Sequence, residues 1–288
     1  MGIFVEPFLA NEFMLRALLA GALVSIACSI VGTFVVLRGL AFIGDALAHG
    51  VLPGIAGALL LGLPGIAGAA IGALAMIGGV NLITRRSRLS SDTAIGLLFV
   101  AMLALGVVIV SRSSSFAGDL VGILFGQILG TSLEGLATQA VATAVVFAVA
   151  LACARPFLLL SFDPEQADVA GFSSRRYHFV MLVLVALTVI VSFQTVGTLL
   201  VFGMLLAPAG AGALLAHRVE AMMAWGSGIG IVSTYVGLLA SYHFDVAAGA
   251  TIVLVAAAIF FTVLAATNVR DRLTAARRGP DAPTSGSA

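Results

Sequence analysis

Lysine is absent from this 288-residue chain, and its 14 basic side chains are all arginines. A nucleotide-binding P-loop needs the lysine of its GxxxxGK[ST] pattern to contact phosphates, and a Schiff-base enzyme needs a lysine amine. The sequence therefore excludes an ATPase of the P-loop kind. We expect a protein that is not an enzyme and that has no permanently bound cofactor.

Cysteine is also scarce. The two cysteines, Cys28 and Cys153, lie in separate apolar stretches. This separation gives no support to a disulfide framework or to a zinc site built from thiolates. We interpret both as packing residues.

Charged side chains make up 9% of the residues and hydrophobic ones 61%, against about 25% and 45–50% in ordinary soluble domains. The 33 glycines lie largely within apolar runs, which is typical of packed membrane helices. The composition predicts an all-α fold, a polytopic integral membrane protein with about eight or nine transmembrane helices. We assign residues 1–268 to a single transmembrane domain and residues 269–288, rich in Pro, Ser, Gly and Ala, to a disordered tail.

Apolar windows of spanning length follow one another along the chain. They cover residues 13–37, 40–62, 64–84, 92–111, 132–160, 178–194, 197–216, 221–241 and 246–267. Two of them contain residues that are unusual in a continuous membrane helix: 40–62 holds an aspartate and a histidine, and 197–216 holds Pro208 among glycines. Either window can be a discontinuous or re-entrant segment.

The arginines predict the orientation of the chain, because short cytoplasmic loops of membrane proteins collect basic residues. With about nine spans, every arginine except Arg16 and Arg112 falls on the same side of the membrane. We predict that this side, which includes the C-terminal tail, is cytoplasmic.

Asp45 and His49 are ionisable residues inside an apolar window, four positions apart. On a helix this spacing places both on one face, and ionisable groups at membrane depth usually face a cavity or a partner. Carboxylate oxygen and imidazole nitrogen suit zinc, manganese or ferrous iron. Two ligands are too few for a four-coordinate site, although a twofold dimer would bring two pairs to its axis. The spacing fits an Asp–His hydrogen bond near the membrane boundary equally well.

A short polar segment between two apolar windows has the features of a complete helix. Asp163 is placed as the N-cap, Pro164 as the first helical residue, Gln166 as the partner that closes a capping box, and Gly171 as the stop. Flanking arginines put the segment on the predicted cytoplasmic side. There a capped helix either docks against another protein or lies on the membrane surface.

Residues 38–54, RGLAFIGDALAHGVLPG, resemble the RxLAxxGDALSHAxLPG signature of the permease subunits of bacterial ABC-type importers of divalent zinc, manganese and iron. Two later segments, 161–171 (SFDPEQADVAG) and 195–210 (TVGTLLVFGMLLAPAG), resemble further stretches of the same family in the same order. The resemblance thus covers nearly the whole chain. This sequence departs from the signature at Ala48, where the family commonly has serine, and at Gly50, where it commonly has alanine.

The resemblance implies that Asp45 and His49 coordinate and gate the transported metal at the axis of a homodimer. It also implies that a cytoplasmic helix couples the permease to a separate ABC ATPase subunit. The coupling residues are Asp163, Pro164, Glu165, Gln166, Ala167 and Gly171. An extracytoplasmic metal-binding protein and the lipid bilayer are the other implied partners, with no nucleic acid. The implied location is the bacterial plasma membrane, and the divalent metal is the transported substrate.

Two alternatives remain. A permease for a metal chelate, such as a siderophore or cobalamin, needs a wide apolar path that Asp45 and His49 would line poorly. The other is a channel, a secondary carrier or an intramembrane enzyme. A secondary carrier should show repeated halves with paired broken helices, and no clear internal repeat is present in the sequence.

Overall fold

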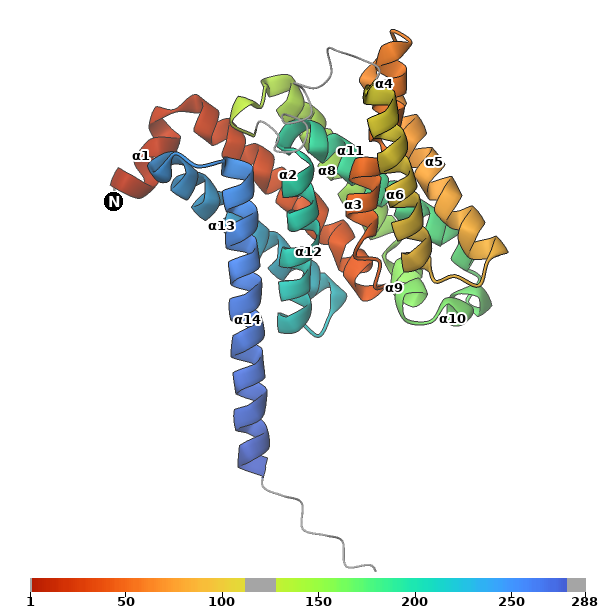
Figure 1. Cartoon of the computed structure of the whole chain (residues 1–288). Coiled ribbons are helices and arrows are strands. Elements are labelled where there is room, and N and C mark those ends of the chain that lie inside the picture. The colour runs from red at the N-terminus through yellow and green to blue at the C-terminus, as the bar shows by residue number, and fades with distance from the viewer. Residues whose placement is uncertain (1, 112–127, 279–288) are drawn as a thin grey trace, which may run out of the picture.

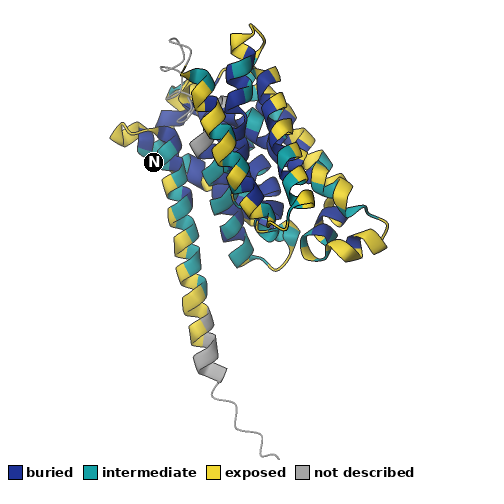
Figure 2. Ribbon diagram, turned by 45° about the vertical axis from the view of Figure 1, so that its right-hand side comes forward, coloured by how far each residue is buried: buried dark blue, intermediate teal, exposed yellow. Residues whose placement is uncertain are grey.

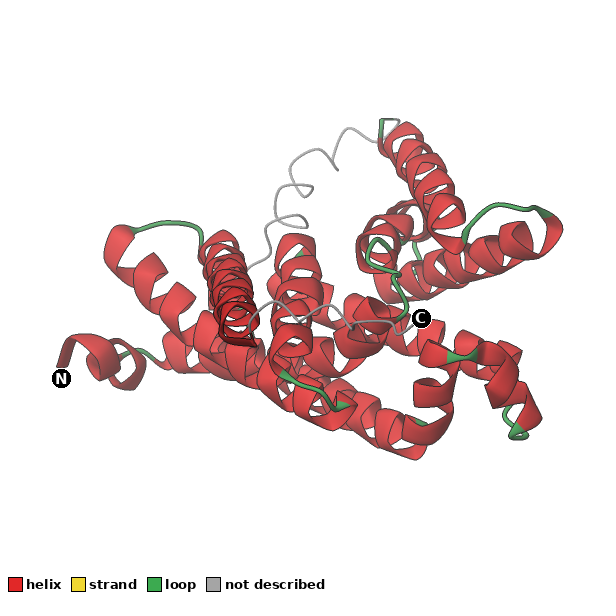
Figure 3. Ribbon diagram, turned by 90° about the horizontal axis from the view of Figure 1, so that it is seen from below, coloured by secondary structure: helices red, strands yellow, loops and turns green. Residues whose placement is uncertain are grey.

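The computed structural model describes residues 2–111 and 128–278, and these residues form helices joined by short loops (Figures 1 and 3). The elements are α1 (Gly2–Ala10), α2 (Glu12–Leu37), α3 (Ile43–Gly50), α4 (Leu52–Leu60), α5 (Gly65–Arg86), α6 (Ser91–Val110), the 3₁₀ turn η1 (Ile128–Gly130), α8 (Leu133–Ala152), α9 (Ala154–Phe162), α10 (Pro164–Val169), α11 (Ser174–Val196), α12 (Thr198–Leu215), α13 (Val219–Phe244) and α14 (Ala248–Arg278). The described ranges contain no strand, and the predicted all-α fold is confirmed.

Eight segments within the described residues are long and apolar enough to cross a membrane, if α3 and α4 are taken as one segment. The last part of α12, Leu200–Leu215, is a shorter apolar helix. Large apolar side chains such as Leu97, Val100 and Val107 are exposed along α6, as expected for a surface that faces lipid. The polytopic architecture predicted from the composition is therefore confirmed.

α2 lies at the centre of the bundle and packs against α8, α12 and α13, while α14 covers α12 and α13 (Figures 1 and 2). Glycines allow these helices to approach closely. A Cβ atom at Gly32 of α2 would collide with the backbone carbonyl oxygen of Leu205 on α12. Likewise, Gly54 of α4 and Gly68 of α5 each face the backbone of the other. These crossings are the small-residue contacts on which membrane helices depend.

The window 40–62 is discontinuous, which is one of the two possibilities that the sequence left open for it. It forms α3 and α4, which meet at Val51. Pro53, near the start of α4, has no N–H to donate to the preceding turn. The window 197–216, in contrast, forms one continuous helix in which Pro208 is accommodated. The chain breaks before it, at Gly197, whose φ of 85° is available mainly to glycine.

The prediction of one span over 132–160 is wrong. Here α8 ends at Ala152 and a separate helix, α9, begins at Ala154. Pro156 lacks the N–H that would bond to the carbonyl of Ala152 in a continuous helix, so one backbone hydrogen bond is missing at the junction.

The predicted disordered tail also needs correction at its beginning, because α14 continues through residues 269–278 to Arg278. Alanine, leucine and arginine favour helix there, and the first helix-breaking pair of residues is Gly279–Pro280. The remaining tail residues, 279–288, lie outside the described ranges.

The connections that carry most arginines lie at one end of the bundle, the lower end in Figure 1. They are the α5–α6 loop, the α9–α11 segment, the α12–α13 loop and the far end of α14. The arginine pattern thus corresponds to one side of the molecule.

Candidate metal pathway and coupling helix

Helix α3 carries the candidate metal pair and is anchored by its apolar face. Ile43 and Leu47 are fully buried, and the helix packs against α5, α6, α11 and α12. A Cβ atom at Gly44 would collide with the Leu205 side chain, so glycine lets α3 lie directly on α12. This packing fixes which face of α3 carries its two ionisable side chains.

Asp45 and His49 lie together on that face, as their spacing predicts. The Oδ1 atom of Asp45 is 3.4 Å from Nε2 of His49, and their side chains are 31% and 18% exposed. This distance exceeds the 2.7–3.2 Å typical of N–H···O hydrogen bonds. Nδ1 of His49 is buried and has no hydrogen-bond partner, while the imidazole ring makes an edge contact with Phe99 at 5.6 Å between centroids. The pair is thus close but only weakly satisfied.

The described part of the chain places no third histidine, cysteine, aspartate or glutamate near enough to complete a metal-binding group. The described residues of one copy therefore offer one carboxylate and one imidazole at this site. Water, backbone carbonyls or a second copy could supply further ligands.

Helix α10 begins as the sequence predicts. Oδ1 of Asp163 accepts hydrogen bonds from the backbone N–H groups of Glu165 at 3.0 Å and Gln166 at 3.1 Å, and Pro164 is the first helical residue. The predicted closure of a capping box by Gln166 is wrong. The N–H of Asp163 donates instead to the carbonyl of Leu159 at 2.8 Å, inside the last turn of α9.

The end of α10 also follows the prediction. Gly171 adopts a φ of 84°, and the N–H of Phe172 donates to the carbonyl of Ala167 at 2.9 Å, which closes the helix. Ala167 is buried, whereas Phe162 and Val169 on either side are 69% and 89% exposed. An arginine-bearing end of a membrane protein that also exposes large apolar side chains is typical of a docking surface.

Two features of this region were missed by the sequence analysis. One is a role for Asp168, whose carboxylate accepts from both the N–H and the hydroxyl of Ser174 at 2.8 Å each, at the first turn of α11. These two hydrogen bonds lower the pKa of the exposed Asp168 carboxyl below its ordinary value. Asp168 thus ties the end of α10 to the start of α11.

The other missed feature is a contact between distant parts of the chain. Nη1 of Arg38, just after α2, lies 2.6 Å from Nδ1 of His178 on α11. His178 is the first residue of the predicted span 178–194, and no local pattern links it to a residue so far away in the chain.

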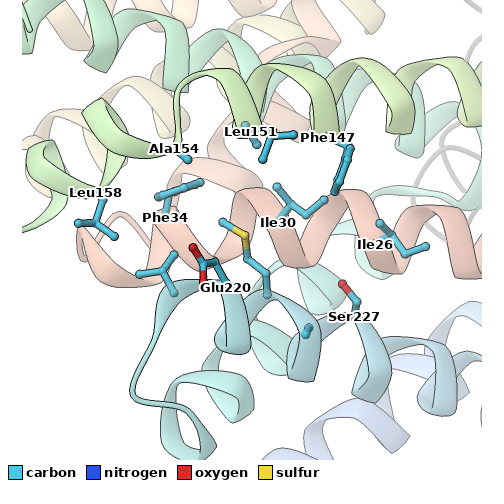
Figure 4. Close-up of a pocket in the computed structure, with 13 residues that line it drawn as sticks. Ile26, Ile30, Phe34, Phe147, Leu151, Ala154, Leu158, Glu220 and Ser227 are labelled. Atoms are coloured by element: carbon cyan, nitrogen blue, oxygen red, sulfur yellow. The ribbon is translucent and has the colours of Figure 1, made fainter.

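A cavity of about 350 Å³ lies elsewhere, between α2, the α8–α9 region and α13 (Figure 4). Its lining is mostly aliphatic and aromatic, with Glu220 and Ser227 as the residues that bring polar side chains. α3 contributes nothing to it. The cavity lacks the ligand set of a metal site, which leaves α3 as the candidate.

A bundle of membrane-spanning helices, with a carboxylate–imidazole pair on a broken helix and a capped helix on its arginine-bearing end, defines a membrane transport protein of the permease class. The chain belongs to the ABC 3 transport family, which matches residues 10–267. The resemblance derived from residues 38–54, 161–171 and 195–210 is therefore confirmed.

Two relatives and one solved structure agree with this family assignment. The chain is 39% identical over 268 residues to a probable iron transport system membrane protein of Haemophilus influenzae, with 93% of this chain and 98% of the relative covered. It is 36% identical over 259 residues to the manganese transport system membrane protein MntC of Listeria monocytogenes, with 90% and 92% covered. Among solved structures, a chain of PsaBC from Streptococcus pneumoniae in complex with Fab superposes with a TM-score of 0.80 at 34% identity, with 90% and 94% covered.

Proposed function

We propose that this chain is the permease subunit of an ABC importer that moves a divalent first-row metal ion, manganese, iron or zinc, into the cell. Two copies form the pathway, and Asp45 and His49 of each line it near the twofold axis. A separate ATPase binds at α10, and an extracytoplasmic protein delivers the metal. The protein resides in the bacterial plasma membrane with its C-terminus in the cytoplasm.

The observation that carries this proposal is the incompletely satisfied pair on α3. A structural Asp–His hydrogen bond would shorten toward 2.9 Å, whereas these atoms are 3.4 Å apart. A buried imidazole nitrogen without a partner is costly unless water or an ion satisfies it. Carboxylate and imidazole together match manganese, ferrous iron and zinc. Because one chain supplies two such ligands, pairing about a twofold axis would double the set.

The family match and the names of the relatives support the transport role and the choice of cargo. The arginine-bearing end supports the orientation, because basic loops remain in the cytoplasm. The exposed apolar side chains beside α10 support a protein partner on that side.

The test is metal uptake by a bacterial strain that lacks its own manganese importers and expresses the permease with its ATPase and binding protein. Asp45→Asn and His49→Gln should each reduce uptake of radioactive manganese by at least about tenfold. Glutamine can still form hydrogen bonds but ligates these metals poorly. The variant His49→Gln therefore distinguishes a ligand from a structural hydrogen bond.

Asp92→Asn and His217→Gln are matched controls, because both residues are exposed and lie outside α3. They should import metal at the rate of the unmodified protein. If membrane insertion is normal and His49→Gln still imports manganese at that rate, His49 is not a ligand.

A further inference from the structure

The contact between Arg38 and His178 joins two residues that are 140 positions apart in the chain. A guanidinium group can only donate hydrogen bonds, so Nδ1 of His178 must act as the acceptor and the imidazole proton must reside on Nε2. The same Nη1 atom lies 4.0 Å from the sulfur of Met181, one turn further along α11. Arg38 and His178 are both half-buried. Partial burial lowers the local dielectric constant and so strengthens a hydrogen bond that carries a charge.

On one side of this contact lies α3, the helix that carries Asp45 and His49. Arg38 opens the short connector that leads from α2 to α3. The connector is held by backbone hydrogen bonds, from Leu40 N–H to the Val35 carbonyl at 3.0 Å and from Ile43 N–H to the Leu40 carbonyl at 3.0 Å. A displacement of Arg38 would therefore be passed to the start of α3, two residues before Asp45.

On the other side of the contact lies α10, the helix proposed to bind the ATPase. His178 lies in the second turn of α11, and the first turn is tied to α10 by the two hydrogen bonds from Ser174 to Asp168. A ring contact between Phe172 and Tyr177, 5.7 Å between centroids, closes the same junction. Movement of α10 would therefore carry the start of α11, and His178, with it.

We propose that Arg38 and His178 form a positioning pair that transmits the movement of α10 to α3. When the ATPase closes and pushes α10, the hydrogen bond between the two side chains shifts α3 and with it the Asp45–His49 pair. This inference rests on the proposed function, because it requires an ATPase at α10 and a metal path at α3.

The pair is not what holds this region together. Phe34 of α2 packs edge to face against Phe157 of α9 at 5.2 Å, and Phe157 in turn contacts Tyr177 of α11 at 6.5 Å. Because neither aromatic contact involves the His178 side chain, loss of the hydrogen bond should uncouple the two helices rather than unfold them.

The experiment measures metal imported per ATP hydrolysed by the complete complex in proteoliposomes, with manganese as the probe. His178→Phe keeps a ring but loses the acceptor, and Arg38→Met loses the donor. Each should lower the ratio about tenfold, within the usual range for coupling between sites, while ATP hydrolysis continues. The double variant should be no worse than either single one, because both remove the same bond.

His178→Asn is the rescue variant. Its amide oxygen can accept from Arg38 near the position of the imidazole Nδ1, so the ratio should stay within about twofold of the unmodified complex. His217→Phe, at an exposed histidine outside the path, serves as the matched control and should leave the ratio unchanged.

A normal ratio in His178→Phe would overturn the inference, and so would an Asn variant that is as uncoupled as the Phe variant. Both results presuppose that the unmodified complex imports manganese. If it hydrolyses ATP without importing any metal, the proposed function fails first, and the inference falls with it.

Discussion

The N-cap of α10 allows the proposed ATPase contact to be tested quantitatively. α10 has six residues, too few to be stable alone, and Asp163 satisfies two of its free N–H groups, those of Glu165 and Gln166. Replacing an N-cap aspartate by alanine costs about 0.5–2 kcal/mol. If the ATPase binds only the formed helix, Asp163→Ala should weaken its binding by about 2- to 30-fold.

The assay is the affinity of the detergent-solubilised permease for its immobilised ATPase. Asparagine and serine cap helices about as well as aspartate, so Asp163→Asn and Asp163→Ser should bind within about twofold of the unmodified protein. These two variants remove the negative charge but keep the cap. If Asp163→Asn binds as weakly as Asp163→Ala, the carboxylate acts through its charge on the ATPase, and the capping argument is refuted.

Two further predictions concern the fold. Gly32→Ala should lower the thermal stability of the solubilised protein, because its Cβ would meet the Leu205 carbonyl and overpacking costs about 1–3 kcal/mol. Gly78→Ala is the control and should leave the melting temperature unchanged, because a Cβ at Gly78 has nothing within 4 Å. Equal melting temperatures of the two variants would contradict the packing of α2 on α12. The lowered pKa of Asp168 means that its bonds to Ser174 stabilise the α10–α11 junction above the ordinary carboxyl pKa and are lost as the pH falls through the lowered value. The protection of the junction amides, expressed relative to the intrinsic exchange rate at each pH, should therefore fall at acidic pH, and Asp168→Asn should abolish much of that pH dependence.

The features that the sequence predicts well are local ones. The spacing of Asp45 and His49 places them on one helical face, and Asp163, Pro164 and Gly171 each favour a specific position at a helix end. Gln166 shows the limit of such patterns. Its capping-box role requires a free N–H on Asp163, but α9 runs so close before α10 that Leu159 takes that N–H.

The features that the sequence did not predict depend on tertiary structure. Hydropathy runs without interruption through Cys153, so only the backbone shows where α8 ends. Arg38 and His178 come together because α2 and α11 pack side by side, and no periodicity in either segment records that contact. For the same reason, an approach of Asp45 and His49 to the same residues of a second copy depends on the packing of two chains, which the sequence of one chain does not encode as a local pattern.

The length of α14 has a practical consequence. Its 31 residues extend over about 46 Å at 1.5 Å per residue, well beyond the roughly 30 Å of hydrocarbon in a bilayer. In Figure 1 its far end stands clear of the other helices. An affinity tag fused after this stem would sit at a distance from the bundle, and it would tether every molecule to a support with the same face outward. Oriented immobilisation of that kind would hold the arginine-bearing face toward the support and leave the opposite face open to the solution.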